Sequence, residues 1–444
     1  MAIETQAPGM TGEEIVALSK AHTLYEWSVQ AKVDPIPVAR AQGVYFWTPE
    51  GQRYLDFNSQ LMCVNIGHAD ARVVEALHQQ LATLPYASPF MATEPRARLG
   101  AKLAEICPGD IDVFFFTNGG AESNENAVKI ARFVTGRHKV LARYRSYHGA
   151  TAGAMTLTGD PRRWMSEPGI PGVVHVSHPY HGVERGWEPV EASLASLEEV
   201  IQLEGPQTIA AFILEPVTGA NGVLVPPDGY LQGVRAICDQ YGILLIADEV
   251  MSGFGRTGKW FAVDHWKVVP DLITMAKGLT SAYVQLGAVG LRRGIADHFK
   301  DRVFYAGLTY NSHTLACAAG LATIAVYEED RLIDNARVLG RVMADRLAQL
   351  AARHPSVGDV RSIGLFGAIE LIRNRATREP LAPFNATSPE MAALQAFFRR
   401  EGLYVFQRWN MLFTSPPLSI TEAQLHDGFD VIDRALALAD RAVL

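Results

Sequence analysis

Short apolar runs alternate with longer amphipathic stretches through the middle of the chain. The runs are rich in β-branched or aromatic residues, as buried strands are, and the stretches between them carry apolar residues at helical spacing. The predicted strands are Val113–Phe116, Val140–Ala142, Ile209–Leu214, Ile243–Ala247, Leu272–Met275 and Gly287–Gly290. The predicted helices between them cover residues 121–134, 191–203 and 229–241. This alternation predicts an α/β fold with a largely parallel central sheet.

The two ends of the chain show a different pattern. Near the N-terminus, residues 11–30 predict a helix with Thr11 as its N-cap. A hairpin of Val44–Trp47 and Arg53–Phe57 is predicted next. After about residue 313 the pattern predicts helices at 313–328 and 331–353, strands at 365–371, 403–406 and 411–414, and a closing helix near 421–442. We therefore expect residues 1–75 and 331–444 to form a small α+β domain beside a large domain of residues 76–330.

Composition and charge exclude several classes of protein. The chain has 444 residues, of which 48% are hydrophobic, and a net charge of −7 without any like-charge block. Disorder is therefore a poor interpretation, and neither nucleic acid nor an anionic membrane is expected as the main partner. The longest apolar runs are far below the ~18 residues that cross a bilayer. No secretory signal is visible at the start, and four scattered cysteines without a CxxC pair predict neither disulfides nor a metal site. We expect a cytoplasmic protein.

Polar residues that directly follow the predicted strands are the candidates for chemistry, because ligands of open α/β sheets lie outside the carboxyl ends of the strands. Gly119 and Gly120 stand at a strand-to-helix turn, where backbone N–H groups and the helix dipole favour an anion. A simple turn that requires positive φ is the alternative. Asp248 ends another strand, where a buried carboxylate needs a partner. That partner is a structural cation, a metal or a pyridinium nitrogen.

A lysine and a tyrosine complete this set of strand-end residues. The chain has nine lysines against 31 arginines, and Lys277 directly follows the predicted strand Leu272–Met275. A partly desolvated lysine can attack a carbonyl and form a Schiff base, although its stem could also simply pack on apolar surface. Tyr147 could stack on a flat cofactor or fill the core. An anion cradle, a stacking ring, a carboxylate and a lysine are the parts that pyridoxal phosphate requires.

Long stretches of the chain resemble the class III pyridoxal-phosphate aminotransferases of fold type I, which include ω-amino acid:pyruvate, ornithine and 4-aminobutyrate aminotransferases. The stretches are FTNGGAESNENAVKIAR (116–132), YHGAT (147–151), LEPV (214–217), ADEVMSGFGRTG (247–258), MAKGLT (275–280) and GLTYNSHTLACAAG (307–320). The resemblance extends from Gly43 to Leu418, and the separation of 29 positions from Asp248 to Lys277 also suits the family.

The resemblance implies a role for each cofactor-site residue. Lys277 would form the Schiff base and act as general base, Asp248 would face the pyridinium nitrogen, and Tyr147 would stack on the ring beside His148. The phosphate would be held by Gly119, Gly120 and Ala121, where relatives often have a serine at the last position. Glu215 would lie near the hydroxyl side of the ring. Thr309 would reach the phosphate of a neighbouring subunit, which implies a homodimer or a dimer of dimers. We expect Arg256 to form an ion pair within its loop.

The expected donor pocket departs from that of relatives specific for 4-aminobutyrate. Those enzymes have an arginine directly after Tyr-His-Gly, where this chain has Ala150. Arg143 and Arg145 lie upstream, and we expect them to form surface ion pairs. Arg408 is the candidate for the arginine that binds a carboxylate in pyruvate-using relatives. Met62 stands where those relatives usually have tryptophan, which predicts a roomier pocket. Tyr86 and Phe90 would add apolar lining from the partner chain.

The predicted function is a transaminase that moves an amino group from an ω-amino acid or amine to pyruvate by a ping-pong mechanism. Transfer to 2-oxoglutarate from a 4-aminobutyrate, ornithine or diamine donor is the alternative. A different pyridoxal-phosphate reaction, such as that of an aminomutase, decarboxylase or racemase, is a further possibility on this fold. A non-catalytic relative is disfavoured because Lys277 and Asp248 are both present.

Overall fold

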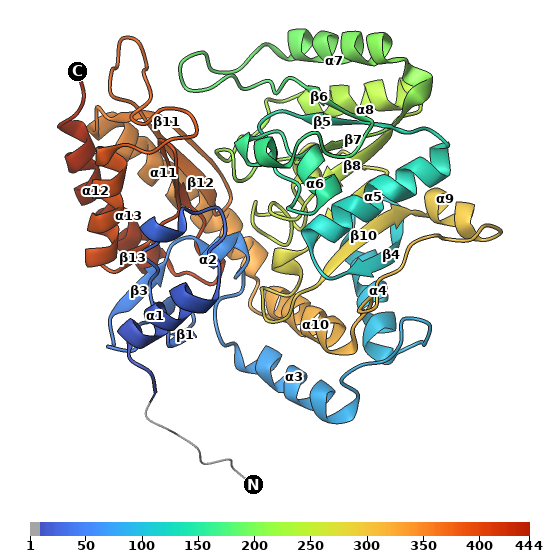
Figure 1. The fold of residues 1–444 in the computed structure, drawn as a ribbon, viewed down its shortest axis with the longest axis horizontal. Helices are drawn as coiled ribbons and strands as arrows, with labels where there is room; N and C mark the ends of the chain where they lie inside the picture. Colours follow the sequence, from blue (N-terminus) through green and yellow to red (C-terminus); the bar gives the residue numbers. More distant parts are fainter. Residues whose placement is uncertain (1–8) are drawn as a thin grey trace.

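The computed structural model describes residues 9–444, and a seven-stranded sheet forms its centre (Figure 1). The strand order is β4-β10-β9-β8-β7-β5-β6. The strands are β4 (Ile111–Thr117), β5 (Lys139–Arg143), β6 (Val173–Val176), β7 (Ile209–Leu214), β8 (Leu244–Asp248), β9 (Leu272–Met275) and β10 (Gly287–Arg292). Neighbours from β9 to β6 are parallel, and β10 is antiparallel to both of its neighbours. All six predicted strands are confirmed, whereas the edge strand β6 was not predicted.

Helices cover both faces of this sheet. Every residue of β7 is buried, and its side chains enter two different cores. Ala211 and Ile213 pack with α5 (Gly120–Thr135), whereas Phe212 packs with α7 (Val190–Glu204) and α8 (Tyr230–Tyr241). A strand that is buried on both faces has a continuous apolar sequence, and this is why β7 could be predicted from its sequence.

Further helices lie beside this sheet, and the last three named below pack with one another and with the C-terminal part of the chain (Figure 1). These further helices are α3 (Ala71–Thr83), α4 (Glu94–Ile106), α6 (Ala152–Leu157), α9 (Arg293–Ala296), α10 (Thr314–Glu329), α11 (Leu332–Arg353), α12 (Pro389–Arg400) and α13 (Glu422–Asp440). The predicted helices α10, α11 and α13 are confirmed, but α3, α4 and α12 were missed. Across residues 9–444, no helix is long and apolar enough to cross a membrane.

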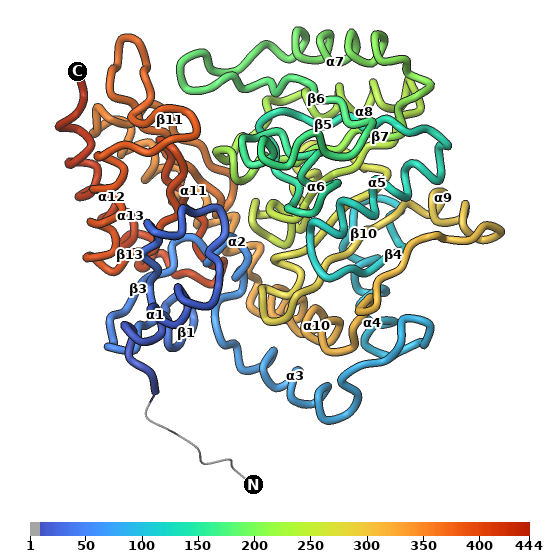
Figure 2. Tube along the Cα trace, viewed as in Figure 1, coloured from blue at the N-terminus to red at the C-terminus, as the bar shows by residue number. Residues whose placement is uncertain are grey.

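The two chain ends pair with each other, and Figure 2 shows the blue N-terminal and red C-terminal segments side by side. The predicted hairpin is present as β2 (Tyr45–Trp47) and β3 (Arg53–Asp56), and β3 also pairs in parallel with β13 (Leu403–Tyr404). β1 (Arg40–Gln42) completes that sheet. A further sheet contains β11 (Val357–Ile363), β12 (Phe366–Leu371), β14 (Gln407–Arg408) and β15 (Met411–Thr414). The domain boundaries at residues 75 and 330 remain a prediction.

The first helix is shorter than predicted. α1 covers Gly12–His22, and Thr11 caps it as expected, with Glu14 completing a capping box. The chain then leaves the helix, because the side chain of Gln30 bonds both the N–H and the C=O of Tyr25 and replaces helical hydrogen bonds there. Trp27 has a φ of 53°, which no α-helix contains. Residues 23–29 are therefore a loop, and this loop reaches the cavity described below.

Candidate active site

A cavity of about 910 Å³ opens where β4, β5, β7, β8 and β9 end and residues from both chain ends meet them. This is the edge at which an open α/β sheet binds its ligands. Most of the predicted site residues line it: Met62, Gly119, Gly120, Ala121, Tyr147, His148, Ala150, Glu215, Asp248, Lys277 and Arg408.

The turn between β4 and α5 forms an anion cradle at one end of the cavity. Gly119 has a φ of 175°, so the alternative explanation, a turn that requires positive φ, is wrong. A Cβ on Gly120 would lie 2.9 Å from Cγ1 of Val250, so a side chain there would collide with its neighbour. The backbone N–H groups of Gly120 and Ala121 have no intrahelical acceptor, as at every helix start, and no side chain caps them. Free N–H groups and the helix dipole together suit a phosphate.

Asp248 lies at the end of β8 and is held by three donors. Its Oδ2 accepts hydrogen bonds from Nδ2 of Asn124 and from Nδ1 of His148, each at 2.7 Å. Its Oδ1 accepts from the backbone N–H of Val250 at 3.0 Å. An ionised carboxylate can only accept, so Nδ1 of His148 carries the proton in this contact. The arrangement fixes a buried negative charge at the cavity wall.

Two buried polar groups lie near Asp248, and one of them has an atom without a hydrogen-bond partner among the described residues. Nε2 of His148 is buried without any hydrogen-bond partner among the described residues. Burial raises the pKa of the Glu215 carboxyl, although the nearby His148 opposes that shift. Glu215 accepts from the N–H groups of Tyr147 and Gly219 at 3.0 and 2.8 Å. An orphaned donor or acceptor at a cavity wall is typical of a ligand site.

Lys277 reaches the cavity from the turn after β9. Its backbone φ is 44°, in the left-handed region that residues other than glycine rarely adopt, and the neighbouring residues Ala276 and Gly278 are buried. Such outliers concentrate at functional sites, where the surrounding structure holds them. The strand-end lysine and the strand-end Asp248 therefore face one cavity, as the sequence predicted.

The phenol ring of Tyr147 is covered by an arginine that the sequence analysis missed. Cζ of Arg162 lies 3.6 Å from the ring centroid of Tyr147 and 5.7 Å from that of Trp27. Arg162 belongs to the short helix η2 (Pro161–Ser166), which Asp160 caps through the backbone N–H of Arg162. The Asp160-Pro161 pair is a helix-start signal that could have drawn attention to this segment.

Arg162 and Arg408 share one buried carboxylate. Oδ2 of Asp160 accepts from Nη2 of Arg408 at 3.0 Å, and both carboxylate oxygens accept from Nε of Arg162 at 3.1 Å. Both arginines line the cavity, whereas Asp160 lies behind them and is 2% exposed. Burial raises the pKa of Asp160, but its contacts with Arg162 outweigh this effect and the net shift is downward. Burial and the neighbouring Arg162 lower the pKa of Arg408 to about 10.

Three other arginines differ from their predicted roles. Arg143 is 1% exposed and donates to the backbone oxygen of Glu215, so it is not a surface residue. Arg145 is half-buried beside the ring of Tyr180, and across residues 9–444 neither arginine forms an ion pair. Arg256 is fully buried and forms no ion pair within its loop. Its guanidinium donates only to neutral oxygens, those of Leu365, Pro416, Ser59 and Asn65. Arg256 therefore connects its loop to segments that are distant in the sequence.

The residues predicted to act across a subunit boundary lie outside the cavity of this chain. The hydroxyl of Tyr86 donates to the backbone oxygen of Thr309 at 2.7 Å, so these two residues lie together. Phe90 is 100% exposed. Their assignment to a neighbouring subunit remains a prediction.

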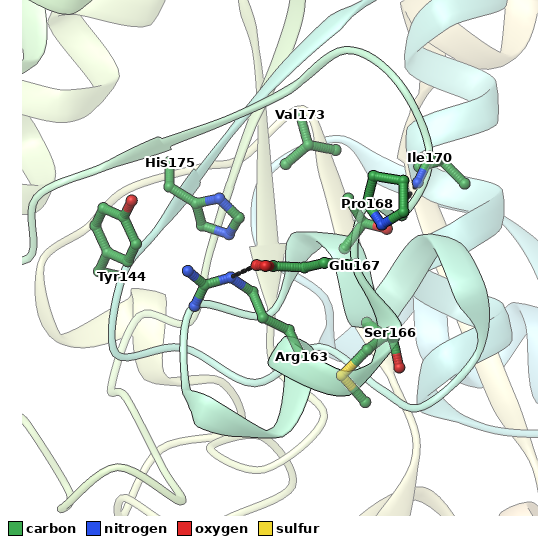
Figure 3. A pocket seen from close by; sticks show the side chains of 11 residues that line it. Tyr144, Arg163, Ser166, Glu167, Pro168, Ile170, Val173 and His175 are labelled. Atoms are coloured by element: carbon green, nitrogen blue, oxygen red, sulfur yellow. Dashed lines mark hydrogen bonds and ion pairs between the residues drawn. The ribbon is translucent and has the colours of Figure 1, made fainter.

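A separate hollow of about 640 Å³ lies beside η2 (Figure 3). Its wall contains Tyr144, His175 and the ion pair between Arg163 and Glu167, whose Nε and Oε1 atoms are 3.0 Å apart. Two consecutive arginines of η2 therefore line different cavities: Arg162 lines the main cavity and Arg163 lines this hollow.

The residues around the main cavity fit pyridoxal phosphate. The free N–H groups at the start of α5 suit its phosphate, and the fixed carboxylate of Asp248 suits a protonated ring nitrogen. Nε2 of His148 is a buried polar atom to which no group of the described residues forms a hydrogen bond. Lys277 supplies the amine that the cofactor aldehyde requires.

Comparison with known proteins supports the same conclusion. The family model described as aminotransferase class-III matches residues 28–436. An omega-aminotransferase of Caulobacter vibrioides is 39% identical over 428 residues, covering 92% of this chain and 95% of that protein. A putrescine–pyruvate aminotransferase of Pseudomonas aeruginosa is 35% identical over 423 residues, covering 92% and 91%. The structure of a taurine:2-oxoglutarate aminotransferase from Bifidobacterium kashiwanohense, in complex with PLP and glutamate, is 41% identical with a TM-score of 0.95, covering 98% and 100%.

These matches confirm the predicted family, fold type and cofactor. The chain belongs to the class III aminotransferases, enzymes of fold type I that depend on pyridoxal phosphate.

Proposed function

We propose that this aminotransferase takes its amino group from an ω-amino acid or a similar amine with an anionic group at the far end, and passes it to pyruvate. The observation that carries the proposal is the charge at the donor end of the cavity. Arg162 and Arg408 both line the cavity, and across residues 9–444 each forms an ion pair with Asp160 alone. Two cationic side chains thus share one carboxylate, although Glu26 and Glu215 also line the cavity, and a carboxylate or sulfonate of the donor would be a further partner for them.

The relatives reported above agree with a small amine donor. Their names give taurine and putrescine as donors, and pyruvate and 2-oxoglutarate as acceptors. Taurine carries a sulfonate at the end opposite its amine, which suits the two arginines. Putrescine has no anionic group, so an enzyme of this family does not need one. The arginine pair of this chain therefore favours the anionic class of donor.

The residues at the other end of the cavity would carry the chemistry. When bound, pyridoxal phosphate supplies an aldehyde that takes up the amino group and a ring that withdraws electrons from the adjacent carbon. We assign Lys277 Nζ to moving the proton to and from that carbon. Asp248 would hold a proton at the ring nitrogen, and His148 and Asn124 fix its carboxylate for this task. Tyr147 would stack on the ring, and Glu215 would lie at its hydroxyl side.

The active unit would be a homodimer. Thr309, Tyr86 and Phe90 are exposed and lie outside the cavity of their own chain, as residues that complete the site of a neighbouring subunit would. The dimer and a cytoplasmic location are part of the proposal.

A second acceptor is favoured by one specific observation. Two cationic side chains at one end of the cavity could also grip a dicarboxylate, so 2-oxoglutarate is the alternative to pyruvate.

A panel of donors and acceptors tests the proposal. The holoenzyme would be assayed with taurine, β-alanine, 4-aminobutyrate, n-butylamine and 1-phenylethylamine, each against pyruvate and 2-oxoglutarate. We expect higher kcat/KM for the anionic donors than for n-butylamine, and Arg408→Gln should reduce the kcat/KM of anionic donors roughly tenfold or more. Equal losses for both classes of donor would contradict the role of Arg408.

A further inference from the structure

One wall of the donor cavity is formed by a segment with an unusual backbone. Leu61 and Met62 line the cavity from α2 (Ser59–Met62), which is a distorted turn without regular helical geometry. Ser59, Gln60 and Met62 all have positive φ, at 48°, 55° and 57°. Three left-handed residues among four, none of them glycine, require a specific explanation.

Gln60 is the most strained of them. Its φ of 55° is combined with a ψ of −102°, which lies outside the small left-handed region that side chains tolerate. Only glycine, which has no Cβ, adopts such a conformation readily. A glutamine at this position therefore raises the energy of the folded state, and neighbouring groups must hold it there.

Asp56 supplies the main anchor. It is fully buried at the end of β3, and both of its carboxylate oxygens accept from the backbone N–H of Gln60 at 3.0 Å. Oδ2 also accepts from the side-chain amide of Gln60 and from Nε2 of His68, each at 2.9 Å. The backbone oxygen of Gln60 accepts from Nδ2 of Asn58 at 2.7 Å. Both the side chain and the backbone of Gln60 are thus fixed.

The preceding residue, Ser59, is held by two other parts of the chain. The hydroxyl of Ser59 donates to the backbone oxygen of Ser415 at 2.7 Å and accepts from Nη2 of Arg256 at 3.0 Å. Arg256 is fully buried and belongs to the loop that follows Asp248. The segment is clamped between two parts of the chain that are far apart in sequence.

We propose that Gln60 is a positioning residue whose strained backbone fixes Leu61 and Met62 and so sets the width of the donor cavity. A wall held in one conformation admits slender donors and penalises bulky ones, whereas a loosened wall discriminates less. This inference concerns the shape of the donor, and it goes beyond the proposed function, which concerns the donor's charge.

The test compares Gln60→Gly with Gln60→Ala in the holoenzyme. Both variants lose the side-chain bond to Asp56, but only glycine can relax the backbone. We expect Gln60→Gly to have a higher Tm than Gln60→Ala, because glycine fits this φ and ψ without strain. In both variants the backbone N–H still bonds Asp56, so the variants differ in backbone freedom: the Cβ of alanine limits the alternative conformations and Gln60→Ala should keep the selectivity of the wild type, whereas glycine can leave this conformation at little cost.

Selectivity is measured with n-butylamine and 1-phenylethylamine, by single-turnover bleaching of the bound cofactor. Neither donor has an anionic group, so the result does not depend on the proposed function. In Gln60→Gly, the ratio of rates for the slender and the bulky amine should fall about fivefold or more relative to wild type. Lys267→Gly is the control, because Lys267 is an exposed residue with a φ of 54° outside the cavity. It should leave the ratio unchanged.

Two results would overturn the inference. Equal ratios in the glycine and alanine variants would show that the strained backbone does not set the width of the cavity. A Tm of Gln60→Gly at or below that of Gln60→Ala would show that no strain is stored at this residue. A failure of anionic donors in the donor panel would contradict the proposed function and leave this inference standing.

Discussion

The two ends of the cavity are built in different ways. At the cofactor end, Asp248 and Lys277 directly follow strands of one sheet, and Gly120 begins the helix after another strand. At the donor end, Arg162 comes from a short helix and Arg408 from a strand of a different sheet, 246 residues later in the chain. The first end is fixed by local structure, whereas the second exists only when distant segments fold together. Under the proposed function, the chemistry shared by the family belongs to the first end, and the choice of donor belongs to the second.

The largest expected effect lies at the cofactor end. Lys277→Ala should abolish transamination by roughly 10⁴-fold or more, because no other amine of the cavity wall can move the proton. Cofactor should still bind through the N–H groups of α5, without the visible absorbance of the lysine-bound form. Stopped-flow spectroscopy and a product assay provide the measurement. Turnover near the wild-type rate would place the reacting amine elsewhere.

Asp248→Asn comes next. The amide cannot keep a proton on the ring nitrogen, so the half-reaction should slow by roughly 10²–10³-fold while the fold survives. Circular dichroism checks the fold and a single-turnover assay gives the rate. Half-reaction rates equal to those of the wild type would assign the carboxylate to structure alone.

At the donor end, Asp160→Asn should act on stability. The variant leaves two half-buried guanidinium groups without their carboxylate, which should cost about 2 kcal/mol of unfolding free energy, the value of a hydrogen bond to a charged group. Added sulfate or taurine should restore more stability to the variant than to the wild type. Thermal unfolding with and without the anion is the measurement, and an equal response of both proteins would count against the shared carboxylate.

The same residue gives a pH dependence. The folded-state pKa of Asp160 is below its ordinary value, so its contribution to stability is complete above that ordinary value of about 3.9. It is lost as the pH falls through the lower folded-state pKa. The wild type should therefore lose more stability than Asp160→Asn on acidification.

The smallest expected effect concerns the predicted contact across the dimer. Thr309→Ala should weaken retention of the cofactor by about fivefold, the value of one hydrogen bond near 1 kcal/mol. Equilibrium dialysis at protein concentrations above and below dimer dissociation measures it. Unchanged retention, or a fully active monomer, would remove Thr309 from the site.

The sequence predicted the cofactor end because that end follows from strand positions. Asp248 and Lys277 stand directly after buried apolar runs, and the topology of a parallel sheet brings such positions to one edge. Arg162 could not be found in this way, because its place over Tyr147 depends on a loop packing onto the sheet. Arg256 was misread for a related reason, since its acceptors are neutral backbone and side-chain oxygens of residues 109 to 197 positions away.

The fold shows the same division. The helix at residues 11–30 was predicted too long because Gln30 folds back on Tyr25, a contact that hydrophobic periodicity does not reveal. The edge strand β6 was missed because three of its four residues are only partly buried and give a weak signal. Fully buried elements such as β7 were predicted with their observed bounds.

Two neighbouring arginines give the most direct test of whether the donor end of the cavity recognises an anionic group. Arg162 lines the main cavity and Arg163 lines the separate hollow of Figure 3. Arg162→Gln and Arg163→Gln each remove one ion pair, with Asp160 and with Glu167, but change different cavities. The measurement is the ratio of kcat/KM for taurine to that for n-butylamine in each variant. We expect this ratio to fall roughly tenfold in Arg162→Gln and to stay unchanged in Arg163→Gln. Equal ratios in both variants would contradict the claim that the donor end recognises an anion.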